Sequence, residues 1–224
     1  MVAVNEIPQT ESKENASVKK IYFIEPEIPN GGKGYLFAKR MIDVIFASIM
    51  GIVLLIPMLV VAGLIRLDSP GDALYHQERV GKNGKTFNII KFRTMHTDAE
   101  ANGPSWAASN DNRCTKLGAM LRKCRIDELP QLWNILKGDM SLVGPRPERP
   151  YFYGEFEKYI HGFSNRLAVV PGLTGLAQIN GGYELKPEEK VVLDMEYIRT
   201  RNLWLDIKLI FKTVSLVFTH EGAR

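Results

Sequence analysis

Residues 44–65 read VIFASIMGIVLLIPMLVVAGLI, which is 22 consecutive positions without a charged side chain. About 20 apolar residues are enough for a helix to cross the hydrocarbon core of a bilayer. The run is longer than the core of a typical signal peptide, and no small-residue cleavage site follows it. The segment is therefore predicted to lie in a membrane rather than in the core of a soluble domain.

A bend inside this run is predicted by Pro57, because proline lacks a backbone N–H and its ring clashes with the carbonyl four residues earlier. Positive charge flanks the run on both sides, and the positive-inside rule places both flanks on the cytoplasmic face. We therefore predict a re-entrant membrane helix over residues 35–66, kinked at Pro57, that enters and leaves the same leaflet. A straight span is the alternative. The charged residues of the flanks are Lys39, Arg40, Asp43 and Arg66.

The composition of the whole chain is that of an ordinary globular protein. It has 224 residues, 45% hydrophobic and 24% charged, with a formal net charge of +4. These values exclude a disordered chain, a collagen-like fibre and a disulfide-rich miniprotein. A mean hydropathy of −0.11 excludes a polytopic membrane protein. Cys114 and Cys124 lack a metal-binding spacing and are expected to be reduced thiols.

The excess positive charge lies directly after the membrane segment. Residues 66–149 hold fourteen Lys and Arg against ten Asp and Glu, whereas residues 150–224 hold nine of each. A basic region beside a membrane attracts anionic headgroups and phosphates. Nucleic acid is not expected as a partner, because the sequence has no zinc-ligand set, helix-turn-helix pattern or aromatic-basic RNA motif.

Three parts are predicted along the chain, and the fold class is a monotopic α+β membrane protein. Residues 1–34 are polar and interrupted by Pro and Gly, so they should form a flexible or loosely docked leader. The re-entrant helix of 35–66 follows. Residues 67–224 should form a mostly helical cytoplasmic domain with a small β-hairpin, closed by the Asn-Gly turn at 83–84. Its C-terminal helix over 203–218 is amphipathic and can lie in the membrane interface or pack on the core.

Residues 121–134, LRKCRIDELPQLWN, contain two adjacent carboxylates, Asp127 and Glu128. An N-cap Asp followed by a first-turn Glu is the simplest interpretation. The pair also suits phosphate chemistry, because one carboxylate can attack or deprotonate, the two can hold Mg²⁺, and nearby arginines neutralise phosphoryl oxygens. The spacing alone leaves both interpretations open. The basic neighbours are Arg122, Lys123 and Arg125.

Two further stretches are candidates for binding anions. Arg146 lies between two prolines, which fix the backbone and favour bidentate contact with phosphate; a structural loop with a solvated arginine is the alternative. Lys91 and Arg93 lie on one face of the second hairpin strand, where they can point together at an anion or form a solvated face.

The stretch PGLTGLAQ at 171–178 contains two glycines, which allow close backbone approach and expose N–H groups. It is neither a GxGxxG motif nor a P-loop, so ATP and dinucleotides are not indicated. A plain turn is the alternative.

Together and in this order, these motifs strongly resemble those of the bacterial sugar transferase family, the monotopic polyprenyl-phosphate phosphoglycosyl transferases. The resemblance covers about residues 35–218. The stretches that carry it, besides the flanks of the membrane helix, are QERVG at 77–81, KFRTM at 91–95, the Asp-Glu motif at 121–134, KGDMSLVGPRP at 137–147, PGLTGLAQ at 171–178 and LWLDIKLIFKT at 203–213.

The resemblance implies transfer of a sugar-1-phosphate from a UDP-sugar to undecaprenyl phosphate, with release of UMP, as the first membrane step of exopolysaccharide, capsule, O-antigen or glycoprotein glycan synthesis. It implies the bacterial inner membrane as the location, with the active site on the cytoplasmic face. The implied partners are the two substrates, membrane lipids and downstream glycosyltransferases, and a homodimer is compatible with it. A non-catalytic membrane-anchored scaffold and a basic phospholipid-binding adaptor are the alternatives.

The resemblance also implies roles for single residues. Asp127 would be the nucleophile that forms a phosphosugar-aspartyl intermediate, a scheme that splits one displacement into two. Glu128 would hold Mg²⁺ together with Asp127, or relay a proton. The residues implied at the substrate phosphates are Arg122 and Arg146, with Lys91 and Arg93 near the same site, and those implied at the nucleotide end of the pocket are Thr174, Gly175 and Gln178.

Overall fold

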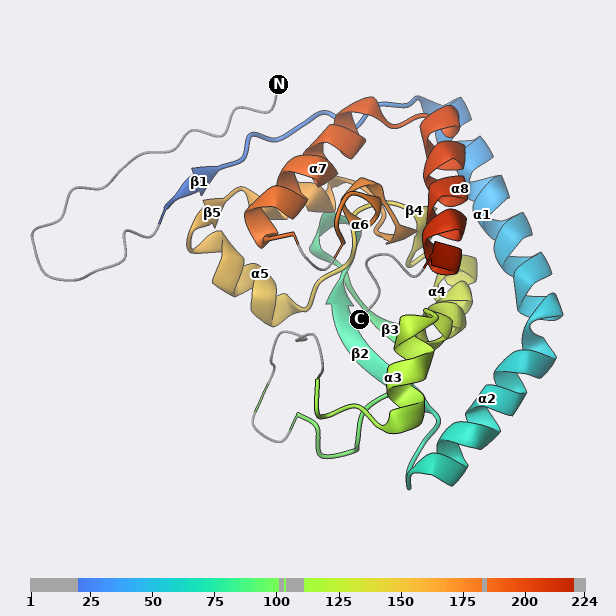
Figure 1. Ribbon diagram of the computed structural model, residues 1–224. Coiled ribbons are helices and arrows are strands. Elements are labelled where there is room, and N and C mark those ends of the chain that lie inside the picture. Colours follow the sequence, from blue (N-terminus) through green and yellow to red (C-terminus); the bar gives the residue numbers. More distant parts are fainter. Residues whose placement is uncertain (1–19, 101–102, 104–110, 183–184, 220–224) are drawn as a thin grey trace, which may run out of the picture.

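The computed structural model describes residues 20–100, 103, 111–182 and 185–219 (Figure 1). Helices and short two-stranded sheets alternate along the chain, which confirms the mixed helix-and-strand class. The helices are α1 (Lys33–Val53), α2 (Leu55–Asp68), α3 (Lys116–Lys123), α4 (Leu132–Lys137), α5 (Pro150–Glu157), α6 (Leu176–Ile179), α7 (Pro187–Thr200) and α8 (Leu203–Thr219). The strands are β1 (Tyr22–Phe23), β2 (Leu74–Val80), β3 (Thr86–Phe92), β4 (Ser141–Val143), β5 (Ile160–His161) and β6 (Gly172–Thr174). The described residues also form three 3₁₀ turns, which are η1 (Lys82–Gly84), η2 (Ile126–Gln131) and η3 (Phe163–Ala168).

The predicted apolar helix is two helices, α1 and α2, that meet at an angle of 61°. The bend lies at Leu54, three residues before Pro57. This displacement has a simple cause, because proline clashes with the carbonyl four residues before it, and that residue is Val53, the last of α1. Among the residues that the structure describes, no single helix is long and apolar enough to cross a bilayer, whereas the bent pair meets both conditions together.

The bent pair runs along one side of the molecule (Figure 1). Many of its large apolar side chains are exposed. Ile52 and Ile56, on either side of the bend, are 77% and 73% exposed. α8 adds to this apolar surface, because its buried Leu209 packs on the core while Trp204 and Phe211 are exposed. Large exposed apolar surfaces are uncommon on soluble domains and often mark sites of contact with a membrane or another protein.

The charged residues at the start of α1 hold the helix to the domain. Asp43 is 4% exposed, and its Oδ1 accepts a hydrogen bond from the backbone N–H of Leu142 at 2.9 Å. Arg40 donates to two carbonyls at the end of α4, and Lys39 forms an ion pair of 2.9 Å with Asp206 of α8. Three of the flanking charges from the sequence analysis are thus engaged with protein groups.

The far end of α2 is also docked. Ile65 is buried together with Phe92 of β3 and Leu121 of α3. The guanidinium of Arg93 donates to the carbonyl oxygen of Ser69 at 2.8 Å and to that of Pro70, so it holds the segment directly after α2. Both ends of the bent pair are therefore anchored in the same folded domain.

The predicted leader is docked in the part that the structure describes. β1 pairs in parallel with β5, and Asn30 exchanges hydrogen bonds with Arg201, whose Nε donates to the Asn30 carbonyl at 2.6 Å. Residues 20–32 are thus docked on the domain, one of the two arrangements expected for the leader, through long-range pairing that their local composition does not reveal. The expectation for residues 1–19 lies outside the described residues.

Two small sheets position the loops around the candidate residues. β2 and β3 form the predicted antiparallel hairpin, and its turn places Asn83 and Gly84 at positive φ, as an Asn-Gly turn allows. β4 and β6 pair in parallel, with Ser141 opposite Gly172 and Val143 opposite Thr174. This pairing sets the Pro-Arg-Pro loop that follows β4 beside the loop that follows β6.

Candidate active site

A sharp turn between α3 and η2 presents the two carboxylates. Arg125 has φ 56° and ψ 18°, a left-handed conformation that a residue other than glycine adopts only at some cost. It occupies the position before the first turn of η2, so Asp127 lies inside that turn and is not its N-cap. The capping interpretation is therefore wrong, and the carboxylate of Asp127 is available for another role.

Asp127 and Glu128 are each 8% exposed and lie beside two cations from distant parts of the chain. Glu128 Oε1 accepts from the Nζ of Lys91 at 3.2 Å and from a terminal nitrogen of Arg146. Lys91 comes from β3 and Arg146 from the loop after β4, so the fold brings together four of the residues singled out in the sequence.

The environment separates the pKa values of the two carboxyls. Burial raises the pKa of Asp127 to about 6, while the Lys91 charge opposes this rise and the Glu128 charge adds to it. Burial would also raise the pKa of Glu128, but the charges of Arg146 and Lys91 outweigh it and hold that pKa well below its usual range. Such divergence between neighbouring carboxyls is typical of functional sites.

The pair lines a cavity of about 490 Å³, a size typical of small-molecule sites. Among the described residues, ten Lys and Arg side chains line it against five Asp and Glu, so this part of the cavity favours an anionic ligand. The cations are Arg79, Lys91, Arg93, Arg113, Arg122, Arg125, Arg146, Arg149, Arg166 and Lys190; the acids are Asp72, Glu100, Asp127, Glu128 and Glu148.

Arg122 and Arg93, two of the predicted phosphate-binding residues, have different kinds of hydrogen-bond partner. Arg122 lines the cavity, and its Nε donates to the hydroxyl of Thr94 at 2.9 Å. Arg93 also borders the cavity, but its two terminal nitrogens donate to the carbonyls that end α2. Lys91 and Arg93 therefore do not point together at one anion, because Arg93 is committed to the backbone carbonyls of residues 69–71, just after α2.

The three residues proposed for the nucleotide end of the pocket also differ in whether they line the cavity. Gln178 lines the cavity, whereas Thr174 lies outside the lining that the described residues form and hydrogen bonds Thr213 of α8 at 2.6 Å. Gly175 packs closely on the backbone, since a Cβ there would lie 2.3 Å from the Gly144 carbonyl oxygen. Gly175 thus fixes the loop, and only Gln178 of the three can meet a ligand in the cavity.

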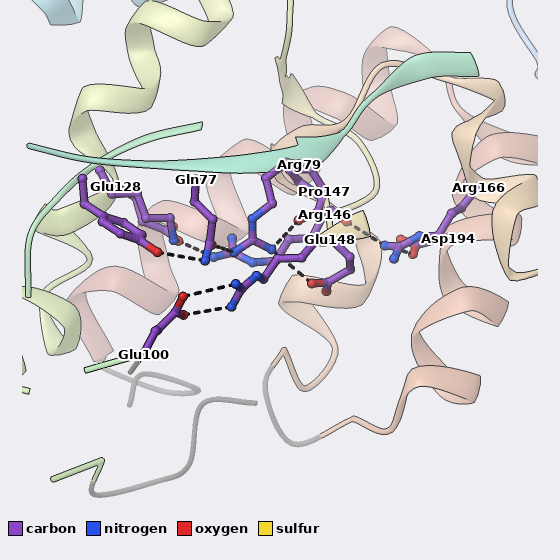
Figure 2. A network of polar contacts seen from close by, with 12 residues as sticks. Gln77, Arg79, Glu100, Glu128, Arg146, Pro147, Glu148, Arg166 and Asp194 are labelled. Carbon is purple, nitrogen blue, oxygen red and sulfur yellow. Dashed lines mark hydrogen bonds and ion pairs between the residues drawn. The ribbon is translucent and has the colours of Figure 1, made fainter. Parts of the chain in front are cut away.

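Sequence reasoning missed a polar network around the loop that carries Arg146 (Figure 2). Arg79 of β2 reaches the loop after Arg146, and Arg149 forms a two-point ion pair with Glu100, at 2.8 and 3.2 Å. Tyr75, Gln77 and Arg79 all line the cavity, and their spacing of two along β2 was the available signal.

A profile described as bacterial sugar transferase matches residues 34–220. The chain belongs to this family. The matched residues include the bent helix pair, the carboxylate pair and the Pro-Arg-Pro loop, so the family assignment covers the whole site.

Several relatives of this sugar transferase have names that state a reaction. It is 44% identical over 194 residues to a UDP-N-acetylgalactosamine-undecaprenyl-phosphate N-acetylgalactosaminephosphotransferase of Aeromonas hydrophila, covering 85% of this chain and 46% of the relative. It is 41% identical over 191 residues to a UDP-glucose:undecaprenyl-phosphate glucose-1-phosphate transferase of Caulobacter vibrioides, covering 83% and 71%.

A third relative, from Escherichia coli K12, carries the same name as the Caulobacter protein. The identity is 39% over 191 residues, which cover 83% of this chain and 41% of the relative. The sugar transferase thus spans less than half of the Aeromonas and Escherichia relatives. The names also differ in the sugar, although the identities are similar.

Asp127 and Glu128 are also the groups to test for a magnesium site. Among the residues that the structure describes, no group of three or more His, Cys, Asp or Glu side chains is arranged to hold a metal. Magnesium, however, commonly binds through one or two carboxylates and completes its shell with water and substrate phosphates. Two adjacent carboxylates in a cavity rich in phosphate-binding cations fit this pattern.

Proposed function

We propose that this sugar transferase moves a sugar-1-phosphate from a UDP-sugar to undecaprenyl phosphate and releases UMP. The observation that carries the proposal is the buried Asp127–Glu128 pair inside a cavity with twice as many cations as carboxylates. The names of the relatives support the same reaction class. A scaffold or a phospholipid-binding adaptor needs the cationic surface but has no use for a buried nucleophile beside it.

In the first step, the Asp127 carboxylate attacks the phosphorus that carries the sugar. The bond from this phosphorus to the bridging oxygen of UMP breaks, and UMP leaves with that electron pair. The product is a phosphosugar ester of Asp127. Arg122, Arg146 and Lys91 neutralise the phosphoryl oxygens during the displacement, which is where enzymes of phosphoryl transfer obtain most of their rate.

In the second step, an oxygen of undecaprenyl phosphate attacks the same phosphorus. The bond to Asp127 breaks, the carboxylate is restored, and the polyprenyl diphosphate sugar forms. The use of one nucleophile for two successive displacements lets a soluble donor and a lipid acceptor use the same site in turn.

Glu128 and Asp127 would hold Mg²⁺ at this site. When bound, the ion neutralises charge on the diphosphate and on the leaving UMP. The depressed pKa keeps Glu128 ionised at neutral pH, which suits a carboxylate that binds cations rather than one that delivers a proton.

We also propose that the bent pair is a re-entrant segment in the bacterial inner membrane, with the cavity on the cytoplasmic face. Residues before the pair, at β1, and residues after it, at β5, pair with each other in one sheet. A straight span would separate these two strands by a bilayer. Docking of both ends therefore supports a segment that returns to the side from which it entered.

Cysteine labelling in intact cells and in inverted vesicles tests this topology. After replacement of Cys114 and Cys124 by serine, single cysteines at the exposed Glu25 and Lys158 should react with an impermeant thiol reagent only in inverted vesicles. Reaction of one position in intact cells and the other only in vesicles would establish a span.

The reaction itself is tested with protein reconstituted in lipid, undecaprenyl phosphate, Mg²⁺ and a panel of UDP-sugars. UMP release that depends on one sugar supports the proposal and identifies that sugar. A panel that includes N-acetylgalactosamine and glucose follows from the relatives' names. UMP release from none of the sugars would overturn it.

A further inference from the structure

The loop that carries Arg146 has few backbone N–H donors. Of the three residues 145–147, only Arg146 has a backbone N–H, because both neighbours are prolines. The prolines restrict φ, but they do not place the loop in space. Its carbonyl oxygens must therefore be held by donors from other parts of the chain.

Backbone donors hold the two ends of this loop. The Pro145 carbonyl accepts from the N–H of Gly172 at 2.9 Å, and the Glu148 carbonyl accepts from the N–H of Val80 at 3.0 Å. The two carbonyls between them, those of Arg146 and Pro147, take side-chain donors instead.

Arg166 of η3 holds the first of these carbonyls. Its guanidinium donates to the Arg146 carbonyl oxygen at 2.9 Å and forms an ion pair of 2.6 Å with Asp194 of α7 (Figure 2). The two side chains of the pair are 2% and 1% exposed. A fully buried cation that is fixed by a carboxylate on a long helix is a rigid donor.

Arg79 of β2 holds the second carbonyl. It donates to the Pro147 carbonyl oxygen at 3.0 Å and to Glu148 at 3.3 Å, and its other terminal nitrogen is held by Gln77 at 2.6 Å (Figure 2). Arg79 and Arg166 belong to elements far apart in the sequence, so two consecutive carbonyls of the loop are held independently.

We propose that Arg79 and Arg166, the latter fixed by Asp194, are positioning residues that hold residues 145–147 and thereby aim the Arg146 guanidinium at Glu128 and at the substrate diphosphate. This inference rests on the proposed function, because it assigns Arg146 a substrate phosphate. It extends that function by giving two further arginines of the cavity lining the task of holding the backbone of the loop that carries Arg146.

The test compares Arg79→Met, Arg166→Met and the conservative Arg79→Lys and Arg166→Lys with the wild type in lipid. We measure kcat and KM for the UDP-sugar, and the affinity of each protein for UDP. A displacement of about 1 Å in a positioned group can cost about 10²-fold in rate, so each Met variant should lose kcat/KM on that scale and bind UDP more weakly. Each Lys variant should recover part of the loss, because one donor remains.

Arg201→Met is the matched control. Arg201 is 7% exposed and also donates to a backbone carbonyl, that of Asn30, but it belongs to the leader contact and not to the cavity. The Arg201→Met variant should have a lower unfolding temperature, as the other Met variants should. Its kcat/KM and its affinity for UDP should stay near the wild-type values.

The inference is overturned if Arg79→Met and Arg166→Met change kcat/KM and UDP affinity no more than Arg201→Met does. If Arg166→Met does not fold, Arg79→Met decides alone, because Arg79 is less buried. If the wild type releases no UMP from any sugar, the proposed function fails, and UDP affinity then decides the positioning role by itself.

Discussion

The bent helix pair and the cavity each reverse the arrangement of a soluble protein, in opposite ways. On α1 and α2, large apolar side chains such as Ile52 and Ile56 face outward, whereas in the cavity charged side chains such as Asp127 and Glu128 are enclosed. Exposed apolar surface is stable only against an apolar solvent, and enclosed cations are stable only beside anions. The first region therefore points to lipid and the second to a phosphate-bearing substrate.

The two regions meet through a few side chains. Arg40 and Asp43 fasten α1 to α4 and β4, and Arg93 fastens the end of α2 beside the strand that carries Lys91. The cavity is thus held at a fixed place relative to the apolar surface. The proposed reaction requires such a fixed arrangement, because the phosphate of a membrane lipid must reach Asp127.

Removal of the proposed nucleophile should have the largest effect. Asp127→Asn keeps the shape and removes the charge, so UMP release should fall by roughly 10⁴-fold or more, as for other covalent catalysts that lose their nucleophile. The protein should still sediment with membranes, because the apolar surface is unchanged.

Asp98→Asn is the control for this variant, since Asp98 is an exposed aspartate outside the cavity lining. It should keep normal turnover. Substantial activity in Asp127→Asn would show that another group is the nucleophile.

A charge on the outward apolar face should break the other region. Lysine at the centre of a membrane helix costs about 3 kcal/mol, so Ile52→Lys and Ile56→Lys should each move protein from the membrane fraction to the soluble or aggregated fraction. The measurement is flotation with liposomes.

Ile28→Lys is the matched control, because Ile28 is 88% exposed but lies in the docked leader. It should float as the wild type does. Equal flotation of all three variants would mean that the exposed face of the bent pair is not in contact with lipid.

The connection between the regions should have a moderate effect on stability. Arg40→Met removes charge-assisted hydrogen bonds to the Ile135 and Leu136 carbonyls, and such a loss costs about 2 kcal/mol. Denaturant unfolding in detergent measures it. An unchanged midpoint would show that these two hydrogen bonds contribute nothing to the attachment of α1.

The raised pKa of Asp127 predicts the smallest effect, a dependence of turnover on pH. The carboxylate attacks only when ionised, so activity is present above the pKa of about 6 and is lost as pH falls through it. At pH 5, kcat/KM for the UDP-sugar should be about tenfold below its plateau. This parameter reports the first step only, so ionisation of the lipid phosphate does not enter. An acid limb near pH 4 would show that the cations around Asp127 outweigh the effect of its burial on the pKa.

Short-range patterns predicted much of this protein correctly. The hairpin follows from an Asn-Gly turn between alternating residues, and the bend follows from Pro57 within an apolar run. The Asp127–Glu128 pair was a candidate because of its basic neighbours, and the fold places both carboxylates in the cavity lining. Each of these features depends on residues that are close in the sequence, so spacing is sufficient evidence.

Contacts between distant segments could not be predicted in this way. Docking of the leader depends on Tyr22 meeting Ile160, and the commitment of Arg93 depends on where α2 ends. The hydroxyl of Thr174 forms a hydrogen bond with that of Thr213 in α8. In each case the partner lies many residues away, and no local pattern signals it.

The sequence by itself determined that an uncharged, proline-interrupted helix precedes a basic domain with an adjacent carboxylate pair, because periodicity, backbone restriction and charge are local properties. The tertiary structure alone decided which cations reach that pair and which hold the backbone. A guanidinium has the same charge at Arg93, Arg146 and Arg166, but packing gives it a helix end, a carboxylate or a loop carbonyl as its partner.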